Sequence, residues 1–377
     1  MTKLADTSDH WLYMQRCISL AKKGRGYVAP NPMVGAVLVH NGRILSEGWH
    51  KCYGQAHAEV NCLEGVKKED QPFISQSTLY VSLEPCAHHG KTPPCADLII
   101  RHRIPKVVVG CVDIFAQVAG KGIEKLKNAG IEVLVDGPWN PDCIHLNRAF
   151  FNFHAHKRPY IILKWASTAD NFIAPNLQPG ASARLLISGA TANRWVHKWR
   201  SEAAAILIGK NTALKDNPFL NNRLYAGPSP IKMVLDPHLQ VSQQANLFKG
   251  TERVIVFNFV KSGNLARSEV RSAPIEYVQL EREKNLAHQI TSYCYKAQIQ
   301  SLFIEGGQRV LQTFLDSRLW DECRIITNTR LATGQGLPAP TFTDYELRRD
   351  IYLGADKISY FVPVKTTKDN VYPLEAS

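Results

Sequence analysis

The sequence has no long hydrophobic run: no window of its 377 residues approaches the roughly 18 uninterrupted apolar positions of a membrane span. A transmembrane helix is therefore not expected. The first 17 residues also lack the apolar stretch of a secretory signal peptide, so we expect a cytoplasmic protein. Repeats of fixed period and low-complexity segments are absent, which excludes collagen, a coiled coil and long disorder as the main architecture.

Sequence signals for nucleic-acid binding are also missing. The 45 Lys and Arg residues outnumber the 33 Asp and Glu residues and give a formal net charge of +12, yet no run of five basic residues occurs. Aromatic RNA-binding motifs and the ligand spacing of C2H2 zinc fingers are absent. The charge favours an anionic partner, and a phosphorylated small molecule fits scattered basic residues; an ordinary basic surface is the alternative.

Nine cysteines occur in this chain without a secretion signal. An odd number in a long chain argues against a disulfide framework. We therefore expect reduced thiols, some of which bind a metal.

The first 150 residues alternate helical and strand patterns. Asn41-Gly42 joins the first two strands and is the strongest short signal for a β-hairpin. This alternation predicts an α/β domain, in which helices cover a sheet. Strands are predicted over 34–40, 44–49, 78–83, 106–112 and 131–135, and helices over 8–24, 57–66, 95–102 and 122–129.

A second alternation begins near residue 158. Residues 140–157 are expected to form a helix plus a linker, and we place the domain boundary near residue 155, with domains over 1–150 and 155–377. No G-x-G-x-x-G follows a first strand, which disfavours a Rossmann cofactor site. Strands are predicted over 160–166, 204–209, 231–236, 253–259 and 301–305, and helices over 191–200 and 286–297.

One set of residues in the first half has the composition of a catalytic zinc site. His57 and Glu59 form the only H-x-E motif of the chain, and Cys86, preceded by proline, and Cys95 follow downstream. Zinc takes nitrogen and thiolate ligands in a tetrahedron, and a catalytic site keeps one position open for water. We therefore expect His57, Cys86 and Cys95 to bind one zinc ion and Glu59 to carry protons, the arrangement of zinc deaminases.

The spacing of the two cysteines narrows this interpretation. Eight residues separate Cys86 from Cys95, whereas common nucleoside and nucleic-acid deaminases have two. The block SLEPCAHHGKTPPC over 82–95, together with NPMVG over 31–35 and the His50 and H-A-E positions, closely resembles the bifunctional deaminase/reductase family of riboflavin biosynthesis. The resemblance extends over essentially the whole chain.

For the first half, the resemblance implies a cytidine-deaminase-like α/β/α sandwich in which Asn31, His50, His88 and Lys91 contact substrate. His88 and Lys91 also lie on the segment between two expected zinc ligands, which by itself places them near the metal, and Lys91 would meet a phosphate. Asp113 is a further implied contact, although the chain continues Ile-Phe-Ala where the family usually has Pro-Asn-Pro.

For the second half, the resemblance implies a dihydrofolate-reductase-like α/β domain that uses NADPH. Cations suit a phosphate, carboxylates suit sugar hydroxyls, and glycines between a strand and a helix let backbone amides approach a phosphate, although a pair of glycines also fits a plain tight turn. The implied substrate contacts are Lys164, Arg184, Asp216, Arg223 and Glu305. The implied cofactor contacts are Asp170, Gly209, Asp216, Gly306 and Gly307.

The reductase half departs from the family pattern at three positions. Asn171 stands where the family commonly has glycine, Leu186 where it has tryptophan, and Asn193 where it usually has arginine. Losing the tryptophan removes a flat surface and a donor, and losing the arginine removes a phosphate clamp, for which Arg184 could compensate.

The resemblance implies a bifunctional enzyme of riboflavin biosynthesis. Zinc-dependent deamination of 2,5-diamino-6-ribosylamino-4(3H)-pyrimidinone 5′-phosphate would be followed by NADPH-dependent reduction of the ribosyl group to ribityl. We expect a phosphorylated pyrimidine as partner, no nucleic acid, no membrane, and a homo-oligomer. Two alternatives stay open: an active deaminase with a non-catalytic reductase-like scaffold, and a nucleic-acid deaminase with an accessory domain.

Overall fold

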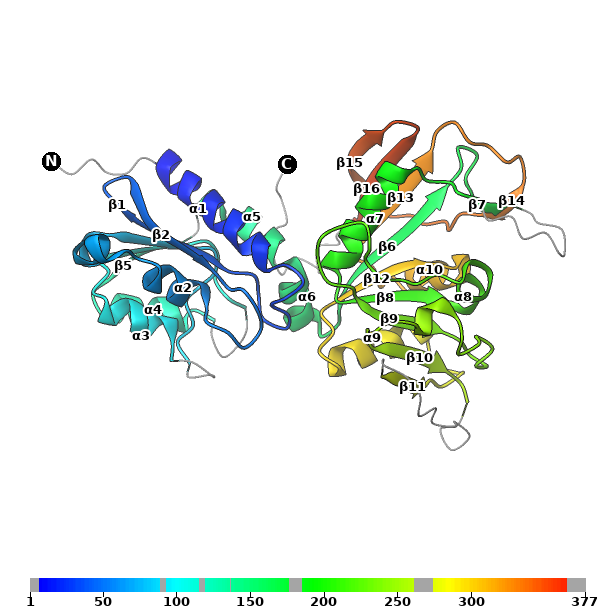
Figure 1. The fold of residues 1–377 in the computed structure, drawn as a ribbon, viewed down its shortest axis with the longest axis horizontal. Coiled ribbons are helices and arrows are strands. Elements are labelled where there is room, and N and C mark those ends of the chain that lie inside the picture. The colour runs from blue at the N-terminus through cyan, green and yellow to red at the C-terminus, as the bar shows by residue number, and fades with distance from the viewer. Residues whose placement is uncertain are drawn as a thin grey trace. The chain divides into compact units, whose positions relative to one another are not determined.

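The computed structural model describes residues 7–88, 93–114, 119–135, 137–175, 185–260 and 274–364. The chain divides into two units, Met1–His156 and Lys157–Asp369, each built on its own large sheet (Figure 1). Across these ranges, no helix combines the length and the apolar character that a bilayer crossing needs.

The sheet of the first unit has the strand order β2-β1-β3-β4-β5. The predicted hairpin is confirmed: β1 and β2 are antiparallel, and Asn41 and Gly42 between them have φ values of 48° and 77°, as a type I′ turn requires. β1 also pairs antiparallel with β3, and β3, β4 and β5 are parallel. The strands are β1 (Gly35–His40), β2 (Arg43–Trp49), β3 (Thr78–Val81), β4 (Lys106–Val109) and β5 (Glu132–Leu134).

Helices cover both faces of this sheet because successive strand residues face opposite sides. In β1, Ala36 and Leu38 pack with α2, α3 and α4, whereas Val37 and Val39 pack with α1 and α5. The two groups of helices lie on opposite faces of the sheet (Figure 1). The result is the expected α/β/α sandwich. The helices are α1 (Thr7–Ala21), α2 (Ala58–Glu64), α3 (Cys95–Arg101), α4 (Lys121–Asn128), α5 (Asn140–Leu146) and α6 (Arg148–His156), and the 3-10 turns are η1 (Lys22–Gly24) and η2 (Lys68–Gln76).

The second unit contains a nine-stranded sheet with the order β11-β10-β9-β8-β12-β6-β13-β16-β15. The seven strands from β11 to β13 in this order are parallel to one another. β16 pairs antiparallel with both β13 and β15. A small second sheet pairs β14 with β7. The strands are β6 (Tyr160–Ser167), β7 (Phe172–Pro175), β8 (Ala205–Gly209), β9 (Ile231–Leu235), β10 (Val254–Asn258), β11 (Ile275–Gln279), β12 (Ser301–Gly306), β13 (Glu322–Asn328), β14 (Gly336–Pro338), β15 (Tyr345–Leu353) and β16 (Asp356–Pro363).

The core of this unit lies between the sheet and two helices. Ile290 and Cys294 of α9, and Leu311 and Phe314 of α10, pack in one cluster with buried strand residues such as Leu207. The parallel strands end at one edge of the sheet, where ligands of open α/β sheets bind. The helices are α7 (Ala190–Glu202), α8 (Lys210–Asp216), α9 (Leu286–Lys296) and α10 (Gln308–Asp316), with the 3-10 turn η3 (Asn246–Phe248).

The structure corrects one prediction of local structure. Residues 140–157 do not form a single helix plus a linker but two consecutive helices, α5 and α6, separated by Asn147. Asn147 is buried, and its side chain bonds both the amide and the carbonyl of Met33 at 2.8 and 2.9 Å. This contact, 114 residues apart in the chain, holds the break between the helices.

Candidate functional site

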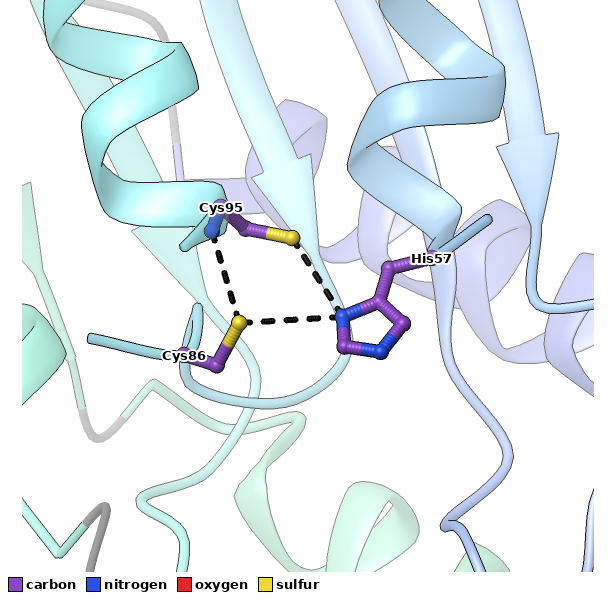
Figure 2. A group of neighbouring side chains, drawn as sticks. All are labelled: His57, Cys86 and Cys95. Atoms are coloured by element: carbon purple, nitrogen blue, oxygen red, sulfur yellow. Dashed lines mark hydrogen bonds between the residues drawn. The ribbon is translucent and has the colours of Figure 1, made fainter. Parts of the chain in front are cut away.

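The three expected metal ligands converge in the first unit. His57 directly precedes α2, Cys95 is the first residue of α3, and Cys86 lies on the loop after β3. The Nδ1 atom of His57 lies 3.6 Å from Sγ of Cys86 and 3.4 Å from Sγ of Cys95 (Figure 2). Within the described ranges, this is the one group of three or more His, Cys, Asp or Glu residues whose ligand atoms lie within 4.8 Å of one another.

The surroundings of the Cys86 sulfur favour a thiolate, whereas hydrogen bonding with Cys86, and then burial, raise the pKa of Cys95. The backbone amide of Cys95 donates to Sγ of Cys86 at 3.4 Å (Figure 2). Hydrogen bonding from Cys95, and then from His57, lowers the pKa of Cys86 although burial opposes this. Thiolate is the form that binds zinc.

Glu59 lies on the first turn of α2, two residues after His57. Its side chain is buried, with a residue exposure of 3%, and burial raises its pKa to about 7. A cation between the three ligands would act in the opposite direction on this carboxyl group. The fold thus places a proton-accepting group beside the candidate metal site.

Asn31 and His50 extend the site next to His57. The His50 ring packs edge-on against the His57 ring with centroids 5.4 Å apart. Nδ1 of His50 lies 3.0 Å from the carbonyl oxygen of Ala56, which can only accept, so the ring proton is on Nδ1. Nε2 of His50 is therefore the acceptor for the Asn31 amide at 3.2 Å. Burial lowers the pKa of His50, which favours this neutral form.

The other expected substrate contacts are less completely defined. His88 is exposed two residues after Cys86, and Asp113 is buried on the loop after β4. Lys91 lies outside the described residues. The roles of all five implied contacts stay predictions.

A charged cluster occupies the carboxyl-end edge of the second sheet. Glu305, near the end of β12, forms two hydrogen bonds with Arg200 of α7, Nε to Oε1 at 2.6 Å and Nη2 to Oε2 at 2.7 Å. The side chains of Arg200 and Glu305 are only 11% and 8% exposed, respectively. Lys164 lies on the adjacent strand β6, and the positive charges of Arg200 and Lys164 lower the pKa of Glu305 against the effect of burial. Of the sequence-predicted residues, Lys164 and Glu305 are thus brought together.

Arg223 reaches the same cluster through its backbone. Its amide donates to Nδ1 of His197 at 3.0 Å, and its Nη1 donates to the Asn221 side chain at 3.1 Å. The Asn221 carbonyl in turn accepts from Nη1 of Arg200 at 3.2 Å. His197 is buried, and burial, followed by Arg200 and Arg223, lowers its pKa to about 4. A neutral His197 therefore holds the loop that carries Arg223.

The three predicted cofactor glycines also meet at this edge. Gly209 ends β8, Gly306 ends β12, and Gly307 lies between β12 and α10. The φ values of Gly306 and Gly307 are 141° and 62°. A Cβ atom on Gly307 would lie 3.9 Å from the Gly209 Cα and 3.4 Å from the Thr212 hydroxyl. Backbone amides at such a strand-to-helix junction can approach a phosphate closely.

Two residues predicted for the reductase site, Asp170 and Asp216, lie in surroundings other than this cluster. A third, Arg184, is not described by the structure. Asp170 accepts hydrogen bonds from the Thr168 hydroxyl at 2.6 Å, the Thr333 amide at 3.0 Å and the Gly334 amide at 2.7 Å, so it joins two loops. Asp216 is the exposed last residue of α8. Arg184 lies outside the described residues. A substrate or cofactor contact at each of these positions stays a prediction.

Both halves of the chain match known protein families. Residues 7–111 match the family model "Cytidine and deoxycytidylate deaminase zinc-binding region", and residues 159–349 match the "RibD C-terminal domain". The riboflavin biosynthesis protein RibD of Aquifex aeolicus is 38% identical over 328 residues, which are 86% of this chain and 88% of that protein. The chain belongs to the RibD family. It therefore combines a deaminase domain with a reductase domain of riboflavin biosynthesis.

Solved structures of RibD proteins share the fold over nearly the whole chain. A Thermotoga maritima protein, named a diaminohydroxyphosphoribosylaminopyrimidine deaminase/5-amino-6-(5-phosphoribosylamino)uracil reductase, matches with a TM-score of 0.83 and 34% identity, covering 95% of this chain and 99% of the other. Acinetobacter baumannii RibD matches with a TM-score of 0.83 and 29% identity, covering 96% and 100%. These likenesses confirm the two expected domain folds.

The three departures from the RibD pattern lie in different surroundings. Asn171 has a φ of 66°, a left-handed conformation that glycine adopts freely and that asparagine tolerates better than most residues. Leu186 is 75% exposed, an unusual position for a large apolar side chain. Asn193 lies on α7, four residues before His197 and seven before Arg200, on the helix face that carries the charged cluster.

Sequence reasoning missed four residues that the structure places at these sites: Arg200, His197, Thr212 and Glu84. His197 and Arg200 are at i and i+3 on a predicted helix, but only the folded sheet shows that they face Glu305. Glu84 directly precedes Pro85-Cys86, and this adjacency was the one available signal.

Proposed function

We propose that the first unit deaminates 2,5-diamino-6-ribosylamino-4(3H)-pyrimidinone 5′-phosphate with one zinc ion, and that the second unit reduces the ribosyl group of the product to ribityl with NADPH. The name of the Thermotoga maritima relative supports both substrates. The observation that carries the proposal is the convergence of His57, Cys86 and Cys95 beside the buried Glu59.

The three ligands fit zinc. Tetrahedral bonds of about 2.05 Å to nitrogen and about 2.3 Å to sulfur separate the two donor atoms by about 3.6 Å. The two nitrogen–sulfur separations here are 3.6 and 3.4 Å. One nitrogen and two sulfur donors also leave the open position that a catalytic site needs. A zinc ion there supplies Lewis-acid activation of water.

In this proposal Glu59 carries the protons. Hydrolytic deamination requires one group to take a proton from the attacking water and to return it to the departing amine, and a carboxyl group beside the metal can do both. Because Glu59 is buried, its proton transfers are shielded from bulk water. Asn31 and His50, joined by their hydrogen bond, would orient the pyrimidine.

In the second unit, Lys164 and Arg223 would bind the substrate phosphate and Glu305, held by Arg200, would face the sugar. Gly209, Gly306 and Gly307 would border the dinucleotide. NADPH bound there would supply the hydride for C1′ of the ring-opened, imine-like substrate, whose nitrogen would take up a proton. The protein's part is orientation and charge compensation, which the fixed Arg200–Glu305 pair supports.

One observation favours a second candidate function, a non-catalytic reductase-like domain. Leu186 and Asn193 replace the usual tryptophan and arginine, and Leu186 is exposed. If this alternative holds, Leu186→Trp combined with Asn193→Arg should create or raise NADPH oxidation. Activity of the natural chain comparable to that of the double variant would reject it.

The proposal also includes a cytoplasmic homo-oligomer that acts on a phosphorylated pyrimidine rather than nucleic acid. Scattered basic residues, rather than a basic run, support the choice of a small molecule. Light scattering of the purified chain measures the oligomeric state directly.

Separate assays of the two reactions test the proposed function. Purified, zinc-loaded protein should release ammonia from the diaminopyrimidine phosphate without NADPH, and should oxidise NADPH only when the deaminated substrate is present. Failure of the first reaction rejects the deaminase proposal, and failure of the second rejects the reductase proposal.

A further inference from the structure

Glu84 is a buried carboxylate, and each of its two oxygens accepts two backbone hydrogen bonds. It follows β3 and is 4% exposed. Oε2 accepts from the amides of Asp113 at 3.1 Å and Gly120 at 2.9 Å. Oε1 accepts from the amides of Gly122 at 2.9 Å and Ile123 at 3.3 Å. One side chain thus satisfies four amides, three of them at the start of α4, where helix amides otherwise have no partner.

The start of α4 packs closely against Pro85, the residue that precedes the expected metal ligand Cys86. A Cβ atom on Gly122 would lie 1.9 Å from the carbonyl oxygen of Pro85, so only glycine permits this approach. The backbone amide of Glu84 also donates to the Cys111 carbonyl at 3.0 Å. Glu84 and Pro85 are therefore both fixed to the loop after β4 and to α4, and Cys86 is the next residue along the chain.

The same carboxylate links the expected metal site to the expected substrate site. Cys86 is held on its other side, because its carbonyl accepts from the Ala96 amide at 3.1 Å and its sulfur accepts from the Cys95 amide at 3.4 Å. Asp113, an implied substrate contact, is bonded to Glu84 through its own amide. Moving Glu84 would therefore disturb both Cys86 and Asp113.

We propose that Glu84 is a positioning residue of the deaminase centre, which fixes the backbone at Cys86 for zinc binding and sets the position of Asp113 relative to it. Glu84 touches neither the metal ligand atoms nor the substrate in this role. It acts through the loop and the helix start that it joins to the Pro85-Cys86 segment. This inference rests on the proposed deaminase function.

The variant Glu84→Gln tests the proposal with little change of shape. Whichever way the amide is oriented, two of the four backbone amides then face an NH2 group, which cannot accept. We expect zinc affinity, measured by competition with a chromophoric chelator, to fall about 10- to 100-fold, the usual effect of losing a residue that supports a ligand. Ammonia release should show a higher KM as well as a lower kcat, since Asp113 also moves.

Glu132→Gln is the matched control. Glu132 lies in the same unit, but its side chain is 61% exposed and pairs with Lys106 at the surface. This variant should keep the zinc affinity and both kinetic constants of the natural chain. Gly122→Ala should weaken zinc binding as Glu84→Gln does, although it keeps the carboxylate, because it forces α4 away from Pro85.

The outcomes separate the proposal from its premises. If Glu84→Gln keeps zinc affinity within about twofold, or if Glu132→Gln lowers it equally, the positioning role is wrong. If the natural chain binds no zinc or releases no ammonia, the proposed function itself fails. Circular dichroism reports whether each variant is folded, and NADPH oxidation reports only that its second unit is intact. Gly122→Ala carries the test if Glu84→Gln does not fold.

Discussion

Arg200 and Glu305, 105 residues apart, form a two-pronged ion pair with contacts of 2.6 and 2.7 Å, almost fully removed from solvent. Removing one partner of a buried pair strands the other charge and costs roughly 3–5 kcal/mol of folding free energy. Glu305→Ala should therefore lower the free energy of unfolding by about that amount and abolish reduction. Chemical denaturation measures the first effect and NADPH oxidation the second.

Two control variants test the physical origin of this loss. Arg200→Met combined with Glu305→Leu removes both charges, so it should recover part of the stability without recovering activity. Asp344→Asn breaks the exposed Arg318–Asp344 pair and should change stability little, since exposed pairs contribute little and asparagine tolerates the φ of 57° at this position. Equal losses in Glu305→Ala and Asp344→Asn would show that burial of the pair is not the cause.

His197 should make the stability of the second unit depend on pH. Its folded-state pKa of about 4 lies below the usual 6.5, because burial and the nearby Arg200 and Arg223 disfavour its charged form. The unfolded chain then binds a proton first, so stability should fall as the pH drops from about 6.5 towards 4. His197→Gln keeps an acceptor for the Arg223 amide and should reduce the change of stability with pH in this range. If the natural protein and His197→Gln lost the same free energy of unfolding between pH 7 and pH 5, this account would be contradicted.

Glu59→Gln should separate zinc binding from deamination. Glutamine keeps the size of the side chain but cannot shuttle a proton, and such help is typically worth about 10²–10⁴-fold in rate. Zinc content should stay unchanged while ammonia release falls by this factor. Near-normal ammonia release would show that Glu59 is not the proton carrier.

The two reactions should respond independently to mutation, because their residues lie in separate units. Glu59→Gln should leave NADPH-dependent reduction of the deaminated substrate intact. Asp216→Ala should lower reduction and leave ammonia release unchanged. If Asp216→Ala abolished ammonia release in a folded, zinc-loaded protein, the second unit would have to help build the deaminase site.

Local signals in the sequence were sufficient for much of the fold and for the metal site. The Asn41-Gly42 hairpin depends only on two adjacent residues that accept positive φ. His57, Cys86 and Cys95 were recognisable because the only H-x-E motif of the chain is followed, in order, by Pro-Cys and a second cysteine. The alternation of helices and strands also predicted the α/β class of both domains.

Features that depend on distant contacts could not be predicted in this way. Nothing local to Arg200 indicates that Glu305 is its partner, and nothing near Glu84 indicates four amide donors that lie 29 to 39 residues further on. The break between α5 and α6 has the same origin, since Asn147 is held by Met33. In each case tertiary hydrogen bonding, rather than local propensity, decides the structure.

The zinc content of the natural chain and of Cys86→Ser, measured together with ammonia release on the same preparations, tests the central claim most directly. Serine is a poor zinc donor, and the substitution leaves His57 and Cys95 in place. The account predicts one zinc per chain and active deamination for the natural protein, and loss of both in Cys86→Ser. A natural protein that releases ammonia without zinc, or a Cys86→Ser protein that keeps both zinc and activity, would contradict it.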